Sequence, residues 1–337
     1  MKNIYINSAK QISVQKPLCN DWFDEPVLYN AQYVRAMDPD FRQYFTPNEA
    51  RRYGKILKRA LLVSREALKE CNLARPDAII TGTGLGCIEN TELFLKDMIF
   101  NGEECLKPTH FMNSTHNTIS SLIAIDTHCC AYNTTYSHKG ASFENALLDA
   151  FMQLEKHSNS NTCSLATALV GAHDEMTPDY FTLLKRIGYL GQGGFAGETA
   201  VAMILATEKS ENYLCKIDAV ELVYENSADR LHGRIALAKR KDIDYVMIGI
   251  NGNHENDKIY FENCQRLFPN VPLLQYKNVF GESYTASAFG VYAAALCLQK
   301  GKIPQNLFAG ASQETPLRNI LIYNHFEGKN HSFVLLS

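Results

Sequence analysis

Short apolar runs alternate with amphipathic stretches along most of the chain, and this alternation indicates its fold class. DAIITGTGLG, SLATALVGAHDE and GETAVAMILATEK contain segments that are apolar at nearly every position. Such segments are typical of strands buried on both faces of a sheet. The stretches between them have apolar residues spaced as in helices that pack on a sheet. The pattern therefore predicts an α/β fold.

The clearest helical pattern is TPNEARRYGKILKRALLVSREALKECN, at residues 46–72. Thr46 and Glu49 have the spacing of a capping box, Pro47 takes the first helical position, and apolar residues continue on one side as far as Leu68. We expect one amphipathic helix over this stretch. The pattern also predicts helices in NTISSLIAIDTHC and over 90–100, 256–267 and 284–299, and strands in CKIDAVELVY, IDYVMIGI, VPLLQY, NILIYN and SFVLLS.

The stretch NTTYSHKGASFENALLDAF, residues 133–151, predicts a strand that turns sharply into a helix, with His138 at the turn. Enzymes often place a nucleophile at such an elbow, because its side chain projects toward the positive end of the helix dipole. Further along, the polar link SENY interrupts the alternation. We therefore expect two consecutive α/β halves, residues 1–212 and 213–337.

Composition and charge exclude several classes of protein. The formal net charge of −3, with no block rich in lysine and arginine, argues against a nucleic-acid partner. No run of about 18 apolar residues occurs, so we expect a cytoplasmic protein without a membrane span. The ten cysteines form no CxxC pair, and the histidines at 110, 116 and 128 lack a zinc-ligand spacing. The glycines at 82, 84 and 86 depart from GxGxxG, so we expect no metal and no cofactor.

Six motifs, in order along nearly the whole chain, together resemble the β-ketoacyl-acyl-carrier-protein synthases, the condensing enzymes of the thiolase fold. They resemble that family's first long helix, the glycine turn after its first strand, the segment ahead of its active-site strand, and its GFxxGEGAxxxxLE, KxxxGHxxxAAG and NSFGFGGxNxxLVL motifs. In this chain they read ARRYGKILKRALLVSREAL, TGTGLGCIENT, PTHFMNSTHNTISSLIA, GGFAGETAVAMILATEK, YKNVFGESYTASAFG and YNHFEGKNHSFVLL.

The resemblance implies a five-layered α/β/α/β/α fold of two similar halves. It also implies a dimer, because in that family the strand before the nucleophile, here AYNTTYS, pairs across the subunit interface. The chain is shorter than a typical member, mostly after residue 210, and loops that cover the substrate tunnel are therefore expected to be missing.

The family's condensation chemistry uses one cysteine and two histidines, and the matching positions differ here. His138 stands at the position of the cysteine, and the first histidine's place falls near Asn251 unless His254 reaches the site. Glu282 replaces the second histidine, while Lys277 matches a lysine that the family retains. A carboxylate would oppose an enolate, and a neutral imidazole is a poor acyl acceptor.

These changes favour a non-catalytic subunit similar to the chain-length factors of type II polyketide synthases, with the aryl polyene or flexirubin pigment systems as the nearest analogues. Such a subunit pairs with an active β-ketoacyl synthase, which works with an acyl carrier protein, and forms one wall of the tunnel in which the chain grows. Chain-length factors usually carry glutamine where His138 stands here.

Two alternatives remain open on the sequence. One is an active synthase or acyltransferase of fatty acid or polyketide synthesis that uses Cys129 or Cys130 as nucleophile, or an unusual pair of His138 and Glu282. The other is a homodimeric acyl-binding protein. Bland interpretations apply as well: His138 is then a polar residue that fills the old nucleophile position, and the two cysteines are structural thiols.

Overall fold

The computed structural model describes residues 3–104, 106–156, 166–191, 193–225, 227–237, 240, 242–310 and 315–337. Its strands are β1 Ile4–Ile12, β2 Ala78–Gly82, β3 Tyr132–Tyr136, β4 Thr167–Asp174, β5 Thr199–Ala206, β6 Cys215–Tyr224, β7 Tyr245–Ile248, β8 Leu273–Gln275, β9 Ile320–Phe326 and β10 Asn330–Leu336. Its α-helices are α1 Pro47–Arg52, α2 Lys55–Glu70, α3 Ile88–Asn101, α4 Pro108–Ser114, α5 Thr118–Asp126, α6 Ser142–Lys156, α7 Pro178–Arg186, α8 Ala228–Arg234, α9 His254–Leu267, α10 Lys277–Phe280 and α11 Ser287–Lys300.

The described strands form one mixed sheet whose two halves repeat the same topology. The strand order is β3-β2-β4-β5-β1-β6-β10-β9-β7-β8. Counted within each half from the outer edge, both halves have the order 3-2-4-5-1, with the same pattern of parallel and antiparallel neighbours. The halves meet where β1 pairs antiparallel with β6. The first half ends with β5 and the second begins with β6. We propose residue 212, in the link between them, as the boundary between the two halves.

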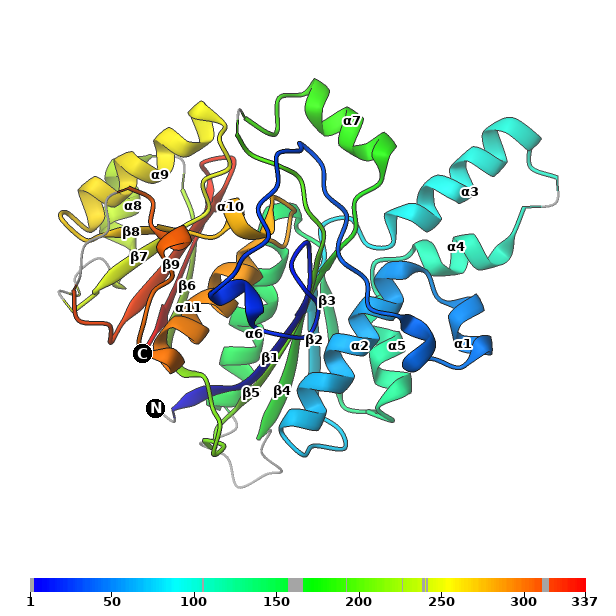
Figure 1. Cartoon of the computed structure of the whole chain (residues 1–337), viewed down its shortest axis with the longest axis horizontal. Coiled ribbons are helices and arrows are strands. Elements are labelled where there is room, and N and C mark those ends of the chain that lie inside the picture. The colour runs from blue at the N-terminus through cyan, green and yellow to red at the C-terminus, as the bar shows by residue number, and fades with distance from the viewer. Residues whose placement is uncertain are drawn as a thin grey trace.

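Three apolar clusters separate five layers of structure. The central cluster packs α6 and α11 between the two half-sheets, with contributions from both halves of the chain. A second cluster joins the outer face of the first half-sheet to α2 and α5, and a third joins the outer face of the second half-sheet to α8 and α9. Figure 1 shows α6 and α11 in the middle of the molecule, with α2 and α9 on opposite sides. The predicted α/β thiolase-like fold of two similar halves is confirmed.

The long helix expected from residue 46 is divided in two. The capping box of Thr46 and Glu49 starts α1 as predicted, but Tyr53 adopts an extended conformation and Gly54 begins a second helix, α2. Glycine lowers helix propensity, so the break occurs where the helix is weakest. The segment PTHFMNS forms the helix α4, which was not predicted.

One edge of the sheet and a nearby helical hairpin expose apolar surface. Strand β3 is an outer strand that pairs only with β2 in the described sheet, and its first two residues are exposed. Helices α3 and α4 project away from the body of the molecule (Figure 1) and pack on each other. Phe100 on α3 and Met112 on α4 are 78% and 68% exposed, and Ile125 on α5 is exposed too. No helix in the described segments is long and apolar enough to cross a membrane.

Candidate functional site

The elbow forms where the sequence predicted it, between β3 and α6. After β3, a short 3-10 helix, Lys139–Ala141, leads directly into α6. The Ser142 hydroxyl stabilises the turn, because it accepts a hydrogen bond from the backbone N–H of His138 at 2.8 Å and donates one to the Lys139 carbonyl at 2.7 Å. Lys139 has a φ of +47°, a left-handed conformation that is costly for a residue with a side chain. The backbone strain at the elbow therefore falls on Lys139.

His138 is exposed on the surface of the elbow. Its Nδ1 atom contacts a neighbouring side chain, Nδ2 of Asn145, at a distance of 3.4 Å. The imidazole does not line the cavity that contains Asn251, Lys277 and Glu282. The structure therefore does not bring His138 and Glu282 together as a pair.

Three of the predicted positions, Asn251, Lys277 and Glu282, line a small polar cavity, which we call the central pocket. It has a volume of about 130 Å³ and lies among the elbow, the loop after β7, the loop before α11 and the end of β9. Its lining residues are Gly140, Tyr189, Asn251, Asn253, Asn256, Lys277, Glu282, Ser283, Tyr284, Ser287, Asn324, His325, Phe326 and Glu327.

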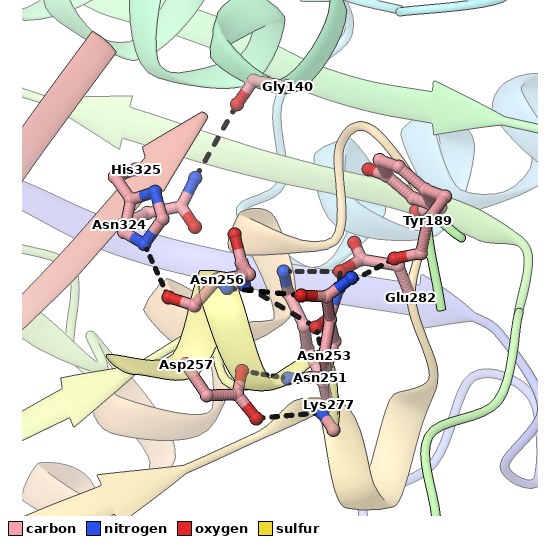
Figure 2. Close-up of polar contacts among 12 residues, drawn as sticks. Gly140, Tyr189, Asn251, Asn253, Asn256, Asp257, Lys277, Glu282, Asn324 and His325 are labelled. Carbon is pink, nitrogen blue, oxygen red and sulfur yellow. Dashed lines mark hydrogen bonds and ion pairs between the residues drawn. The ribbon is translucent and has the colours of Figure 1, made fainter. Parts of the chain in front are cut away.

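Glu282 is bound within this pocket by two donors. Its Oε2 atom accepts a hydrogen bond from Nζ of Lys277 at 2.7 Å and one from Nδ2 of Asn251 at 2.8 Å (Figure 2). The side chains of Lys277 and Glu282 are only 10% and 3% exposed, so the ion pair is buried. The structure thus brings together Asn251, Lys277 and Glu282, three of the residues singled out in the sequence.

In this arrangement Glu282 engages the hydrogen-bond donors that condensation chemistry would need. A condensing enzyme stabilises an enolate with donors that point at the developing negative charge. Here Lys277 and Asn251 point at the carboxylate of Glu282, which already carries a negative charge. The charge of Glu282 is therefore compensated inside the central pocket, and these two donors are already engaged.

Asn324 links the central pocket to the elbow. Its Nδ2 atom donates to Oε1 of Glu144 at 2.6 Å and, at 3.5 Å, to the Gly140 carbonyl, while its Oδ1 atom accepts from the Tyr260 hydroxyl at 2.7 Å. Figure 2 shows Asn324 reaching toward Gly140 across the two halves of the fold. Glu144, which was not singled out in the sequence, is buried at the start of α6, and this burial raises its pKa.

Three predicted candidates lie outside the pocket. His254 is exposed at the first position of α9 and does not line it. Cys129 and Cys130 precede β3, whereas the elbow follows it, so the length of the strand alone, roughly 13 Å, separates them from His138. Cys129 is buried with its Sγ atom 3.3 Å from the Pro76 carbonyl, and Cys130 is exposed.

The glycine-rich turn after β2 binds a carboxylate of the chain itself. Oδ1 of Asp174 accepts hydrogen bonds from the backbone N–H groups of Gly84 and Leu85, both at 2.9 Å, and from the Thr83 hydroxyl at 3.1 Å. A side chain at position 84 would collide with Tyr284, so glycine is required there. The turn is occupied by Asp174, and its N–H groups are not available to a nucleotide phosphate.

Two residues of the site escaped the sequence analysis. Asn324 matches the first position of the NSFGFGGxNxxLVL motif, and this motif could have identified it. Glu144 has no such signal, because a glutamate in the first turn of a helix usually stabilises the helix end at the surface.

The chain resembles known proteins in both sequence and fold. Residues 43–242 match the family model described as "Beta-ketoacyl synthase, N-terminal domain". No curated protein is significantly similar to the chain. Among solved structures, the ishigamide ketosynthase/chain length factor superposes with a TM-score of 0.81 at 16% identity, covering 100% of this chain and 99% of that one.

Two further structures show the same likeness. A β-ketoacyl synthase from Burkholderia phymatum has a TM-score of 0.77 at 12% identity, with 100% of this chain and 99% of that one covered. A ketosynthase in complex with its chain length factor from Xenorhabdus doucetiae gives 0.77 at 15% identity, with 100% and 98% covered. These structures share the fold with this protein. Since the family model spans more than half of the sequence, the chain belongs to the β-ketoacyl synthase family.

Proposed function

We propose that this protein is a non-catalytic, chain-length-factor-like subunit that pairs with an active β-ketoacyl synthase and forms one wall of its acyl tunnel. The observation that carries the proposal is the central pocket, where Lys277 and Asn251 both point at Glu282. In a site organised in this way the two donors bind the carboxylate of Glu282 and are not free to stabilise an enolate. The proposed system is type II polyketide or fatty acid synthesis of the pigment-forming kind.

The elbow supports the same proposal. His138, at the position that the resemblance gives to the nucleophile, is exposed and has no general base beside it among its described contacts. A nucleophile of this class needs an adjacent base or a strongly lowered pKa. We propose that His138 takes no acyl group and that Cys129 and Cys130 are structural.

The exposed edge strand supports a partner subunit. The outer edge of β3 offers backbone groups to a second chain, and the hairpin α3–α4 carries exposed apolar side chains close by in the sequence. Edge strands of this kind pair with another chain unless they are protected. We propose that the partner is a synthase subunit that carries the full cysteine and histidine set, and that an acyl carrier protein serves the assembled pair.

Acyl transfer from the carrier protein tests the catalytic half of the proposal. The chain is incubated with an acyl carrier protein that carries a short acyl group, alone and together with a synthase encoded beside it, and intact masses are measured. We expect no adduct on this chain, and an adduct on the cysteine of the synthase. A stoichiometric adduct on Cys129, Cys130 or His138 would identify the chain as an enzyme itself.

Co-purification tests the partner half. We expect the chain to co-purify with the synthase, and Ile125→Asp, on the exposed face of α5 near β3, to weaken the complex. Phe261→Asp is the matched control, since Phe261 is 45% exposed on α9, at the other end of the molecule. A stable homodimer with no affinity for the synthase would favour a homodimeric acyl-binding protein instead.

A further inference from the structure

Helices α3 and α4 contribute almost nothing to the apolar core of the protein. Both are described at every position, and Asn90 is the one buried residue that they contain. In the described part of the chain, no side chain of either helix belongs to an apolar cluster of the body. Helix α3 packs closely on α4, and no other described helix or strand contacts it as closely. Because most helices are held in a fold by a buried apolar face, this hairpin must be attached in another way.

Polar contacts attach α3 to residues 175–179, the segment that leads from β4 into α7. Oε1 of Glu175 accepts a hydrogen bond from the backbone N–H of Glu89 at 3.0 Å. The hydroxyl of Thr177 donates to the carboxylate of Glu92, one turn further along α3. A hydrogen bond to a charged group contributes more than one between neutral groups, so these contacts hold the first turns of the helix.

A third contact follows one turn later. Nζ of Lys96 lies 2.5 Å from Oδ2 of Asp179. These side chains are 52% and 62% exposed, so salt weakens their attraction. Residues 89, 92 and 96 share one face of the helix, because they are three and four positions apart. We call the three contacts the polar ladder.

Between α3 and the body lies a cavity of about 260 Å³. Its wall on the body side includes the buried charged side chains of Arg59, Glu175 and Glu198, and α3 adds one apolar side chain, Leu93. Arg59 is paired with Asp38 and Glu198, neither of which lies on the hairpin. Moving α3 away from the body would break little apolar contact, so the hydrophobic effect does not oppose this movement strongly.

The two chain links that join the hairpin to the body lie side by side, at Gly86 and His116. Gly86 has a φ of +60°, and a β-carbon there would lie 3.2 Å from the ring of His116. On the body side of these links the chain is fixed, because Asp174 binds the turn before Gly86 and Ile119 anchors α5 in the second apolar cluster. Two adjacent links between well-packed elements allow the hairpin to rotate about them, as in hinge movements.

We propose that α3 and α4 form a lid over this charged cavity, which swings as one unit about the links at Gly86 and His116 and is held shut by the polar ladder. The lid opens when the contacts of Glu92 and Lys96 are lost, and high salt favours opening because it screens the pair of Lys96 and Asp179. The links and the ladder both lie within this chain, so the lid is expected with or without a synthase partner.

Double electron–electron resonance on the full chain measures the movement. Spin labels are attached to unnatural amino acids at positions 100 and 183, where Phe100 on α3 and Leu183 on α7 are 78% and 55% exposed. Glu92→Met combined with Lys96→Met removes both side chains from the ladder, and methionine has about the same helix propensity as glutamate and lysine. We expect a second, longer distance in this variant, with an open-to-closed ratio at least about tenfold above that of the wild type and an open fraction of at least about a tenth.

Lys258→Met combined with Glu262→Met makes the same chemical change on α9, on the opposite side of the molecule from the hairpin, and should leave the distances unchanged (Figure 1). In Glu92→Met alone, which keeps the pair of Lys96 and Asp179, raising the salt concentration from about 0.1 to 1 M should raise the open-to-closed ratio by about two- to fivefold. Hydrogen exchange should show the amides of α3 beyond its first turn equally protected in all variants, because the helices move without unfolding.

The lid is overturned if the double variant has the same distance distribution as the wild type, or if the control on α9 changes the distribution as much. It is also overturned if salt has no effect on Glu92→Met, or if the whole of α3 exchanges faster in the double variant, since the hairpin then unfolds and does not swing. Circular dichroism checks that each variant is folded. Should the double variant not fold, Lys96→Met alone carries the test: at least about a twofold rise in the open population supports the lid, and no rise overturns it.

Discussion

Replacing Lys277 by methionine should destabilise the protein strongly, because it leaves the buried carboxylate of Glu282 without its counter-charge. The two side chains are 10% and 3% exposed and 2.7 Å apart. Removal of one partner from a buried ion pair typically costs about 3–5 kcal/mol. Since Asn251 still donates to Glu282 in the variant, we expect the lower end of this range, about 3 kcal/mol in the free energy of unfolding.

A double-mutant cycle separates the pair from its surroundings. In the Lys277→Met background, Glu282→Gln removes the stranded charge and keeps an acceptor for Asn251, so the double variant should be more stable than Lys277→Met alone. Urea unfolding is followed by the fluorescence of Trp22, the chain's single tryptophan. Trp22 reports on this region, because its ring lies 4.9 Å from that of Phe280, two residues before Glu282.

The exposed pair of Lys258 and Glu262 on α9 is the matched control. These side chains are 58% and 63% exposed, so Lys258→Met should change the free energy of unfolding by less than about 1 kcal/mol. If Lys277→Met costs no more than Lys258→Met, the pair in the central pocket is hydrated. Lys277 and Glu282 would then not form the buried ion pair on which the proposal of a non-catalytic pocket rests.

Three further changes test one strained and two buried groups elsewhere in the fold. Burial lowers the pKa of His173 to about 3, so its contribution to the free energy of unfolding is complete above about pH 6.5 and is lost as the pH falls. Between pH 7 and 5 the wild type should therefore lose about 2 kcal/mol relative to His173→Leu in urea unfolding, and parallel pH curves would contradict this. Burial raises the pKa of Glu175 to about 8, so the protein loses stability as the pH rises from about 4.5 to 8. Between pH 6 and 8 the free energy of unfolding of Glu175→Gln should rise by about 2 kcal/mol relative to the wild type, and a constant difference would show that Glu175 does not titrate there. Lys139→Gly should raise the free energy of unfolding by about 1 kcal/mol, because glycine adopts the left-handed conformation of this residue without strain. Lys139→Ala keeps the β-carbon and should not raise it; equal effects of the two changes would show that the strain is not at this residue.

Much of the fold could be predicted from the sequence, because its strands are apolar on both faces. Strands β4 and β5 are buried along nearly their whole length between helical layers, and this produces the continuous apolar runs that mark them. The repeated strand order could not be predicted from the pattern, since β1 and β6 meet at the centre through pairing between residues more than 200 positions apart. The break at Tyr53 and Gly54 was missed because the apolar stripe continues through it.

Only the site residues that occupy motif positions could be predicted from the sequence. Lys277 and Glu282 are five residues apart, at the start of α10 and just after its end, so the sequence already allowed them to pair. Asn251 comes from a different loop, and its hydrogen bond to Glu282 depends on how the end of β7 meets the start of α11. His138 shows the opposite outcome: its position at the elbow was predicted correctly, while the direction of its side chain depends on the turn that Lys139 and Ser142 form.

The location of these features favours a function at the surface of the molecule over one in its central pocket. Turning the central pocket into a working catalytic site would require Lys277 and Asn251 to release Glu282, which leaves a buried carboxylate uncompensated and is opposed by several kcal/mol. The edge of β3 and the hairpin α3–α4 need no such rearrangement to meet a partner, because their backbone and apolar groups are already exposed. This difference in cost supports our proposal that the chain presents that edge to a subunit whose own pocket does the chemistry.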